Sequence, residues 1–377
     1  MYYFESKWSL SAIHLSSATP NHSEAALPAP RPDRIWLLAD DLTGGCDAGA
    51  AFLRAGLRVR VWAGAQASFA APETVQAVNT ASRALPPDEA ARAVSSAAAA
   101  FRGGDRTLFF KKIDSALRGP IAAELNAAHQ GLRTRAILLA PAFPAARRTV
   151  RHGILEVEDV SGRRETKRIR DLFPRSMEDS VAQLAGADEL APALERGKTV
   201  LICDGMTQED LDRLARAAQP LRGLLYAGSA GLAQAIAGPY ATRVPPSRIP
   251  GATRTLVVCG TSHPVTELQL KDLDHKRFVA VEVLRIRCEN GDENRIRAAF
   301  EAVHPQAMVL TGGDTALLAL RALGVHSLVL RGECTPGIPW GSAEGGTADG
   351  STIVTKSGGF GAVSALNEVL EMLTGRA

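Results

Sequence analysis

The stretch "LLADDLTGGCDAGAAF", from Leu37 to Phe52, runs from an apolar strand through two adjacent aspartates and a glycine-bearing turn into a helix. A strand that passes through a short turn into a helix is the building unit of a parallel α/β sheet. Asp40 and Asp41 stand where the buried strand ends. Two neighbouring carboxylates repel each other and resist removal from water, so something must stabilise them. The candidates are a cation, a metal ion, or a hydroxyl group whose proton is taken.

The same alternation of strand and helix continues along the chain from Arg34 onward. Further strands are expected at residues 57–63, 74–82, 107–114 and 136–142. Helices are expected at residues 88–101 and 120–129, and Pro120 suits a first helical position, where its missing N–H costs nothing. Strands separated by helices predict a parallel sheet that is covered on both faces.

Beyond these elements, the chain divides into two parts. A less regular, arginine-rich region covers residues 145–175, after which the alternation resumes with "TVLICDG" and "LLYAG". A proline-rich segment, "GPYATRVPPSRIPGATR", then predicts a linker, with the boundary at residues 244–254. The predicted fold is therefore α/β with two domains, 34–245 and 254–377. Each is expected to be a mainly parallel sheet flanked by helices, with an active-site cleft between them, and residues 1–33 are expected to form a flexible tail.

The composition is that of an ordinary globular protein and excludes several classes. A chain of 377 residues suggests two domains, and a net charge of +3 does not single out nucleic acid as a partner. The five cysteines have no C-x-x-C spacing, which predicts reduced thiols in a cytoplasmic protein. No apolar run reaches the roughly 20 residues that span a membrane, and the opening segment lacks the apolar core of a secretory signal. We therefore expect neither a nucleic acid nor a membrane as a partner.

Polar side chains cluster at three expected strand ends of the first domain, where ligands of open parallel sheets gather. The clusters are Asp40, Asp41 and Asp47; Asn79, Ser82 and Arg83; and Lys111, Lys112, Asp114, Ser115 and Arg118. Taken singly, Asp47 is explained as a carboxylate in the first turn of a helix, and Ser115 as a turn cap. One of the two lysines is expected to point to solvent, because neighbours on a strand face opposite ways. Together the cations suit a carboxylate and the aspartates suit hydroxyl groups, so a small polyhydroxy acid fits this edge.

The second domain has three strand–turn–helix junctions of another kind: "CGTSHP", "LTGGDTA" and "TKSGGFG". Glycines let the backbone approach a ligand, and the N–H groups at a helix start bind phosphate oxygens. Neither a Walker A motif nor a G-x-G-x-x-G motif is present, and Asp314 taken alone is more typical of a helix N-cap. His152 and His263 have no zinc-site spacing. Three such loops in one domain favour a phosphate-rich ligand.

The ordered set of motifs "ADDLTGGCDAG", "KKIDSALRG", "PAFPAARRT", "GSAGLA", "TGGDTA" and "KSGGFG" resembles the four-carbon acid sugar kinases. This family includes D-threonate, D-erythronate and 3-oxo-tetronate kinases, and the resemblance runs from about Arg34 to the C-terminus. It implies a sugar acid in the first domain, ATP with Mg²⁺ in the second, and transfer of the γ-phosphoryl group to the terminal hydroxyl of the acid. Ala116 and Cys46 depart from the family pattern, which leaves the exact acid open.

The resemblance also implies roles for individual residues. It implies substrate contacts at Asp41, Arg83, Lys112, Ile113, Asp114 and Ser115, and the strand-end clusters add Asp40 and Arg118 to the expected substrate-binding residues. The ATP-binding residues would be Ser262, Gly312, Gly313, Asp314, Thr315, Gly358 and Gly359. The catalytic residues would be Asp41, Lys112 and Asp114, with either aspartate orienting the nucleophilic hydroxyl and taking its proton; no residue is assigned to the metal.

Two alternatives follow from the same residues. A metal-assisted aldolase or dehydratase would use the aspartate pair on a hydroxy acid and would act without nucleotide, but it leaves the glycine loops unexplained. A non-catalytic sensor would bind the acid and the nucleotide without turnover. The sequence leaves the oligomeric state open, a homodimer included.

Overall fold

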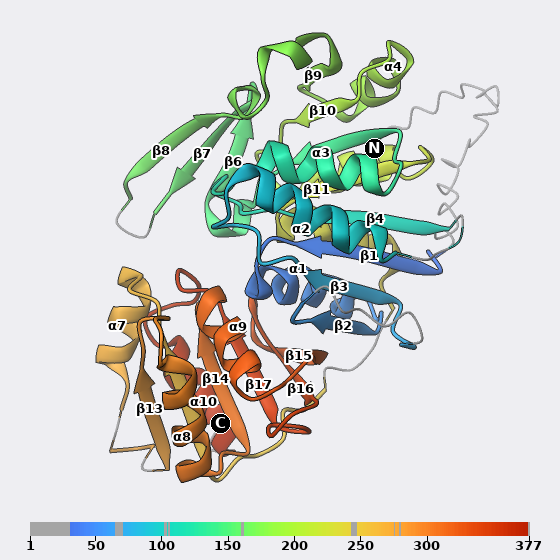
Figure 1. Ribbon diagram of the computed structural model, residues 1–377. Helices are drawn as coiled ribbons and strands as arrows, with labels where there is room; N and C mark the ends of the chain where they lie inside the picture. The colour runs from blue at the N-terminus through green and yellow to red at the C-terminus, as the bar shows by residue number, and fades with distance from the viewer. Residues whose placement is uncertain are drawn as a thin grey trace, which may run out of the picture.

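The computed structural model describes residues 31–64, 71–101, 104, 106–159, 162–242, 247–274, 276–278 and 280–375. Within these ranges, fourteen strands form one sheet in the order β13-β12-β14-β17-β16-β15-β2-β3-β1-β4-β11-β5-β10-β9 (Figure 1). Most of the predicted tail (residues 1–30) and part of the predicted linker (residues 243–246) lie outside the described residues.

The first half of the sheet is parallel throughout, as the alternation predicts. Its strands are β1 (Arg34–Ala39), β2 (Val59–Trp62), β3 (Val75–Asn79), β4 (Thr107–Lys112), β5 (Ala136–Ala140), β9 (Val181–Leu184), β10 (Val200–Cys203) and β11 (Leu224–Gly228). Its helices are α1 (Leu42–Arg54), α2 (Pro87–Ala99), α3 (Ile121–Gly131), α4 (Leu190–Glu195), α5 (Gln208–Ala218) and α6 (Ala230–Ala237). The central strands are buried on both faces, as parallel strands under helices must be.

The second half of the sheet mixes strand directions. Strands β12 (Thr255–Cys259), β13 (Val281–Arg285), β14 (Ala307–Thr311) and β17 (Thr352–Lys356) are parallel. Strands β15 (Ser327–Thr335) and β16 (Ile338–Glu344) form an antiparallel hairpin beside β17. The helices are α7 (Pro264–Asp272), α8 (Asp292–Val303), α9 (Gly313–Ala322) and α10 (Ala365–Thr374).

The hairpin joins the two halves, because β15 pairs with the edge strand β2 of the first half. Val329 lies opposite Arg60, whose guanidinium donates to Glu73 at 2.9 Å and to Ser327 Oγ at 2.9 Å and also contacts Glu344. Two parallel sheets are predicted from the sequence, and the structure connects them edge to edge through this junction. Local alternation identifies strands, but it carries no information about which edge strands pair.

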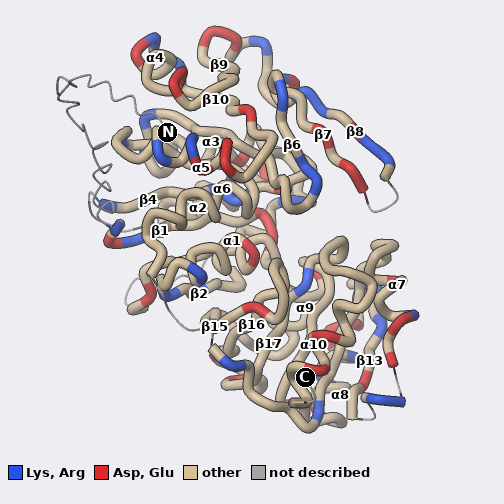
Figure 2. Tube along the Cα trace, turned by 180° about the vertical axis from the view of Figure 1, so that it is seen from behind, with Lys and Arg blue, Asp and Glu red and all other residues tan. Residues whose placement is uncertain are grey.

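The arginine-rich region is more regular than the sequence suggests. It forms an antiparallel sheet of β6 (Arg148–Arg151), β7 (Ile154–Glu158) and β8 (Arg164–Arg168). The charged side chains of β7 are glutamates, whereas β8 carries arginine and lysine with one glutamate (Figure 2). Lys167 Nζ donates to the carbonyl oxygen of Ala116 at 2.8 Å, so this small sheet contacts the turn after β4. The 3-10 helices among the described residues are η1 (Pro144–Ala146), η2 (Ile169–Leu172), η3 (Arg175–Ser180), η4 (Ala187–Glu189) and η5 (Gly238–Tyr240).

Two predictions of helix starts are wrong by one or two positions. Pro120 is the N-cap residue, not the first helical residue, of α3. Gly312 is the N-cap of α9, with φ 102°, so Asp314 lies inside the first turn and is not the cap. In both cases the chain enters the helix through a backbone conformation that propensities alone do not specify.

Candidate active site

The turn after β1 is held by Asp41, which caps α1. Its Oδ1 accepts from the backbone N–H of Gly44 at 2.8 Å, and its Oδ2 accepts from Thr43 Oγ1 at 2.9 Å. An aspartate in this position satisfies a backbone donor that the helix leaves unpaired. One of the two adjacent aspartates therefore has a structural task in addition to any chemical one.

Arg83 stabilises the charges of both aspartates. Its Nε and Nη2 donate to Asp40 at 2.8 and 2.9 Å, and its Nη1 and Nη2 donate to Asp41 at 2.9 Å each. Burial alone would raise the pKa of the Asp40 carboxyl, but Arg83 and the neighbouring lysines outweigh burial and lower it. Arg83 is therefore the cation that stabilises the aspartate pair.

The turn after β4 is organised by Asp114 in a similar way. Its carboxylate accepts from the backbone N–H of Ala116 at 2.9 Å and from Arg118 Nε and Nη2 at 3.0 and 2.6 Å. Against the opposing effect of burial, Arg118 and Arg83 hold the pKa of this carboxyl well below its usual range. Ile113 is buried and donates its N–H to Gly228, while Ser115 lies partly exposed in the turn. The structure therefore brings the predicted substrate-binding residues together.

Both lysines of β4 are buried, so the prediction that one of them points to solvent is wrong. Lys112 Nζ donates to the carbonyl oxygen of Ile113 at 3.0 Å and lies against Gly44 in the first turn of α1. Lys111 Nζ forms an ion pair at 2.8 Å with Glu124 of α3, and both side chains are at most 1% exposed. The two lysines do face opposite ways, but helices cover both faces of this sheet.

Asp47 lies in the middle of α1, so its explanation as a first-turn carboxylate is also wrong. The side chain is buried, and this burial raises the pKa of its carboxyl to about 6. Lys112 opposes the shift, whereas Glu333 of β15 adds to it. The spacing of Asp47 from Asp40 and Asp41 in the sequence does not predict that it lies near Lys112 and Asp41.

The three glycine-bearing loops of the second half lie together. A Cβ atom on Gly358 would lie 2.7 Å from Thr261 Oγ1, and one on Gly312 would lie 3.2 Å from Thr261 Cβ. The loop of residues 260–263 therefore packs directly against the other two. The buried Thr315 Oγ1 accepts from Gly260 N–H at 3.1 Å, while Ser262 and Asp314 are exposed.

A buried lysine that sequence reasoning missed anchors the last of these loops. Lys356 Nζ donates to the carbonyl oxygens of Ser357 and Phe360 at 3.0 and 3.3 Å and to Thr266 Oγ1 at 3.2 Å. Burial lowers the pKa of this amine to about 8. The lysine stands in the motif "KSGGFG", but nothing in its spacing shows that its side chain turns back on its own loop.

The charged side chains at the turns after β1 and β4 (the charged cluster) and the three glycine loops meet at Asp41. A Cβ atom on Gly313 would lie 2.4 Å from Asp41 Oδ2, so a side chain there would displace this carboxylate. Ser357 Oγ donates to Thr43 Oγ1 at 3.2 Å, and the rings of Phe143 and Phe360 lie 6.0 Å apart. The start of α1 therefore touches two of the three glycine loops.

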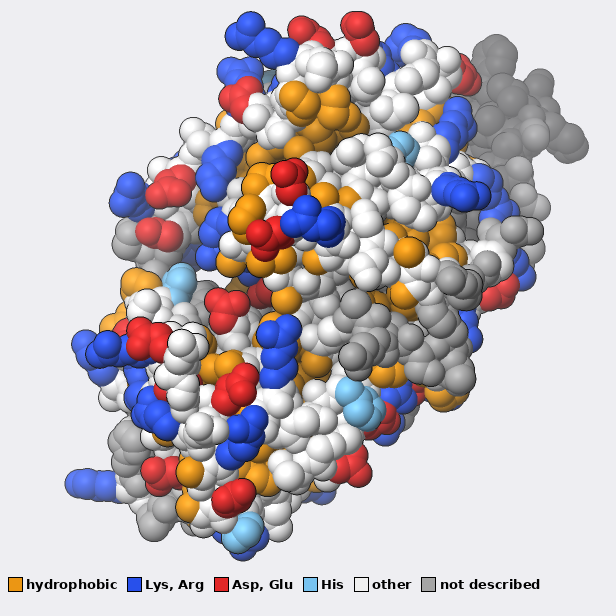
Figure 3. Space-filling view, viewed as in Figure 1, with side chains coloured by type: hydrophobic (Ala, Val, Ile, Leu, Met, Phe, Trp, Pro, Cys, Tyr) orange, Lys and Arg blue, Asp and Glu red, His pale blue; other side chains and the backbone are white. Residues whose placement is uncertain are grey.

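Other features of the described residues add little. They contain no group of three or more His, Cys, Asp or Glu side chains that could hold a metal, and no helix in them is long and apolar enough to cross a membrane. The described cysteines are all free thiols. Positive and negative side chains are interspersed over the face shown in Figure 3.

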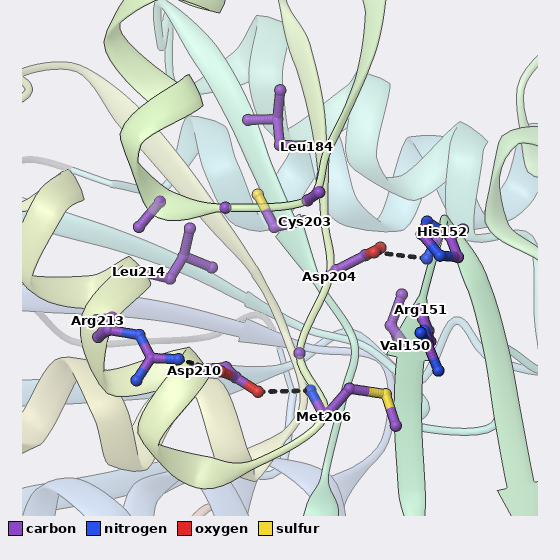
Figure 4. Close-up of a pocket in the computed structure, with 14 residues that line it drawn as sticks. Val150, Arg151, His152, Leu184, Cys203, Asp204, Met206, Asp210, Arg213 and Leu214 are labelled. Atoms are coloured by element: carbon purple, nitrogen blue, oxygen red, sulfur yellow. Dashed lines mark hydrogen bonds and ion pairs between the residues drawn. The ribbon is translucent and has the colours of Figure 1, made fainter.

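A cavity of about 270 Å³ lies apart from this cluster (Figure 4). Strand β6, the end of β10 and the start of α5 line it, and Asp204 there accepts the backbone N–H of His152. None of the predicted site residues lines this cavity.

Comparison with known proteins agrees with the two halves of the structure. Residues 35–179 and 163–236 match the family of sugar-binding N-terminal domains, and residues 294–366 match the nucleotide-binding C-terminal domains. A D-threonate kinase of Bordetella bronchiseptica is 31% identical, over 87% of this chain and 94% of that protein. The chain belongs to the four-carbon acid sugar kinase family.

Other members of the four-carbon acid sugar kinase family show the same relationship. A D-threonate kinase of Salmonella typhimurium is 29% identical over 89% of this chain and 97% of its own length. A D-erythronate kinase of Heliobacterium modesticaldum is 28% identical over 64% of this chain and 60% of its own length. A solved structure described as a putative tRNA synthase from Salmonella typhimurium shares the fold, with a TM-score of 0.67 at 17% identity over 90% of this chain and 99% of that one. A Haemophilus influenzae structure from a family of unknown function has a TM-score of 0.65 at 18% identity with the same coverage.

Proposed function

We propose that the protein transfers the γ-phosphoryl group of ATP to the terminal hydroxyl of a four-carbon sugar acid. The observation that carries the proposal is the contact between Asp41, in the charged cluster, and Gly313, in a glycine loop. An acceptor bound at the first cluster and phosphates bound at the loops would then be neighbours, which phosphoryl transfer requires. The curated relatives, which are named as kinases of four-carbon acids, support the same assignment.

The proposal divides the chain at the expected linker. Residues 34–245 would bind the acid and residues 254–377 the nucleotide, with the active site in a cleft between them. The backbone N–H groups near Gly312 and Gly358 would take the phosphate oxygens, together with Ser262 and Thr315. In support, the fourteen-stranded sheet has its strands before residue 229 on one side of the β2–β15 junction and those after residue 254 on the other.

Mg²⁺ would enter with the nucleotide in this proposal. The ion binds few protein ligands in such sites and relies on phosphate oxygens and water, so it does not require a cluster of three carboxylates. It would neutralise part of the phosphate charge. The exposed Asp314 beside the loops would help hold it.

The residues of the first cluster would position the acceptor. Lys112 would balance the charge of the migrating phosphoryl group. Asp114 would orient the hydroxyl, because a carboxyl with such a low pKa is a weak proton acceptor. Asp41, which lies beside Gly313, would take the proton.

The first experiment is a measurement of ADP release from ATP and Mg²⁺ with D- and L-threonate, D- and L-erythronate and 3-oxo-tetronates. Release that depends on one acid would establish the kinase and identify its acceptor. ATP binding without turnover on any of them would favour the sensor. Loss of a hydroxy acid without nucleotide would favour the aldolase or dehydratase, and absence of ATP binding would refute the assignment of the second half. A homodimer and a cytoplasmic location remain predictions.

A further inference from the structure

Arg148 is a charged residue of the motif "PAFPAARRT" that the predicted site does not include. Its Nε and Nη1 are inaccessible to solvent, and neither has a hydrogen-bond partner within the described part of the chain. Burial of a cation without a partner is costly, and buried donors in folded proteins are nearly always paired. An anion that is not part of the described chain would satisfy this guanidinium.

The backbone of Arg148 is fixed where the two halves meet. Its carbonyl oxygen accepts from Phe143 N–H at 2.7 Å, and its own N–H donates to the Phe143 carbonyl at 3.1 Å. Strand β7 pairs with the other side of the residue, since Arg148 lies opposite Val157. The Phe143 ring in turn packs against Phe360 of the last glycine loop. The residue is therefore held on both sides, and its position does not depend on the charge of its side chain.

The charged groups around Arg148 come from several elements but do not neutralise it by direct contact. Asp114 and Asp47 attract the guanidinium, Arg118 repels it, and His263 of the second half also lies within electrostatic range. Among these, Asp114 already accepts two hydrogen bonds from Arg118.

The arginines first expected to bind the substrate are in a different situation. Arg83 uses Nε, Nη1 and Nη2 on Asp40 and Asp41. Arg118 uses Nε and Nη2 on Asp114. To bind a carboxylate with these same atoms, either residue would first have to release an aspartate.

We propose that Arg148 binds the carboxylate of the sugar acid. The inference rests on the proposed function, and it gives Arg83 the task of positioning Asp40 and Asp41. Nη2 together with either Nε or Nη1 offers two parallel N–H donors, which match a carboxylate. Arg148 belongs to the half that matches the sugar-binding domains, which favours the carboxylate over the transferring phosphoryl group as its ligand. The residue would then select acids over neutral compounds of the same shape.

The test compares Arg148→Gln with wild type on D-threonate and on its uncharged primary amide. Loss of a charged, buried pair of hydrogen bonds should raise the KM for the acid on the order of a hundredfold. The KM for ATP should stay within about twofold, and the preference for acid over amide should largely disappear, because the amide never had the charge contact. Arg148→Lys should be intermediate, since it keeps the charge but not the paired geometry.

Calorimetric titration with D-threonate in the absence of nucleotide distinguishes the two candidate anionic ligands of Arg148, the carboxylate of the acid and the transferring phosphoryl group. Weaker binding to Arg148→Gln supports the carboxylate, whereas unchanged binding with a loss confined to kcat would assign Arg148 to the phosphoryl group and overturn the proposal. Arg151→Gln is the matched control, because Arg151 is exposed on the same strand and should leave every constant unchanged. An acid preference that survives in a folded Arg148→Gln protein also overturns the inference.

The same data distinguish this inference from the proposed function. If wild type binds D-threonate and Arg148→Gln binds it equally well, only the inference fails. If wild type neither binds nor phosphorylates D-threonate, D-erythronate or the 3-oxo-tetronates, the proposed function fails and the inference with it.

Discussion

At the residue scale, Asp41 combines a cap, an ion pair and a contact with the glycine loop. Asp41→Asn keeps an oxygen that caps α1, so the fold should survive, because asparagine caps helices about as well as aspartate. The variant loses the carboxylate that accepts a proton, and we expect kcat to fall by about a hundredfold or more with the ATP affinity little changed. Steady-state kinetics and nucleotide titration measure both quantities. A variant with near-normal kcat would remove Asp41 from the mechanism.

Asp47 provides a pH-dependent prediction at the same scale. The pKa of its carboxyl is raised from 3.8 to about 6 in the fold, so the protonated form is favoured there. The stabilisation that this provides is present below the unfolded pKa and is lost as the pH rises through about 6. Asp47→Asn imitates the protonated form. Its free energy of unfolding should therefore exceed that of wild type by on the order of 2 to 3 kcal/mol at pH 8.

The measurement for Asp47→Asn is urea unfolding at pH 4.5 and pH 8. The gain over wild type should be clearly smaller at pH 4.5, where wild-type Asp47 is itself largely protonated. An equal gain at both pH values would show that the titration of Asp47 is not its cause.

At the scale of elements, the glycine loop before α9 packs tightly against its neighbours. Gly312 has φ 102°, and a Cβ atom there would lie 3.2 Å from both Thr261 and Thr315. Gly312→Val should weaken ATP binding at least about tenfold, because the displaced loop no longer presents its N–H groups. D-threonate binding should stay unchanged, since the acid is assigned to the other half. Calorimetric titration with each ligand tests both statements.

Gly350 is the matched control for this loop. It also has a positive φ, of 77°, but a Cβ atom there would meet nothing within 4 Å. Gly350→Val therefore carries the backbone strain without the collision, and ATP should bind as to wild type. Equal losses in the two variants would assign the effect to strain and not to the contact.

Individual elements were predictable from the sequence, whereas their partners were not. The strand ending at Ala39 and the helix after Asp41 follow from local alternation and from glycine placement. The burial of Lys111 depends on its ion pair with Glu124 of α3. The contact of Lys356 with the last glycine loop depends on how that loop folds back over the lysine. Arg148 lies within one of the family motifs, but only the absence of a hydrogen-bond partner for its described donors distinguishes it from a surface arginine. These features are set by tertiary contacts, which no local pattern encodes.

At the scale of the whole molecule, the two halves depend on the junction around Arg60. Arg60→Met leaves the buried Glu73 without its cation and should lower the free energy of unfolding by about 3 kcal/mol. Because this junction joins the two halves of the sheet, we expect scanning calorimetry to resolve two transitions in the variant where wild type shows one.

Arg54→Met is the control for the junction. Arg54 also links the first half to β15, through Glu333, but its side chain is 46% exposed. Surface pairs contribute about 1 kcal/mol or less, so this variant should keep a single transition and nearly full stability. Two transitions in both variants, or in neither, would contradict the role given to Arg60.

The pairing of β2 with β15 also has a consequence for synthesis on the ribosome. Arg60 and Ser327 touch across the junction but are 267 positions apart in the chain. At about 5–20 residues per second, roughly 13–53 s pass between the synthesis of Arg60 and that of Ser327 in the hairpin that covers this edge. During that time the nascent protein exposes unpaired N–H and C=O groups along β2, which other chains could join. Glu73 of the first half already pairs with Arg60 in the middle of that strand, but Arg60 Nη1 finds Ser327 and Glu344 only in the second half. A guanidinium with an unpaired donor at an open edge disfavours such association.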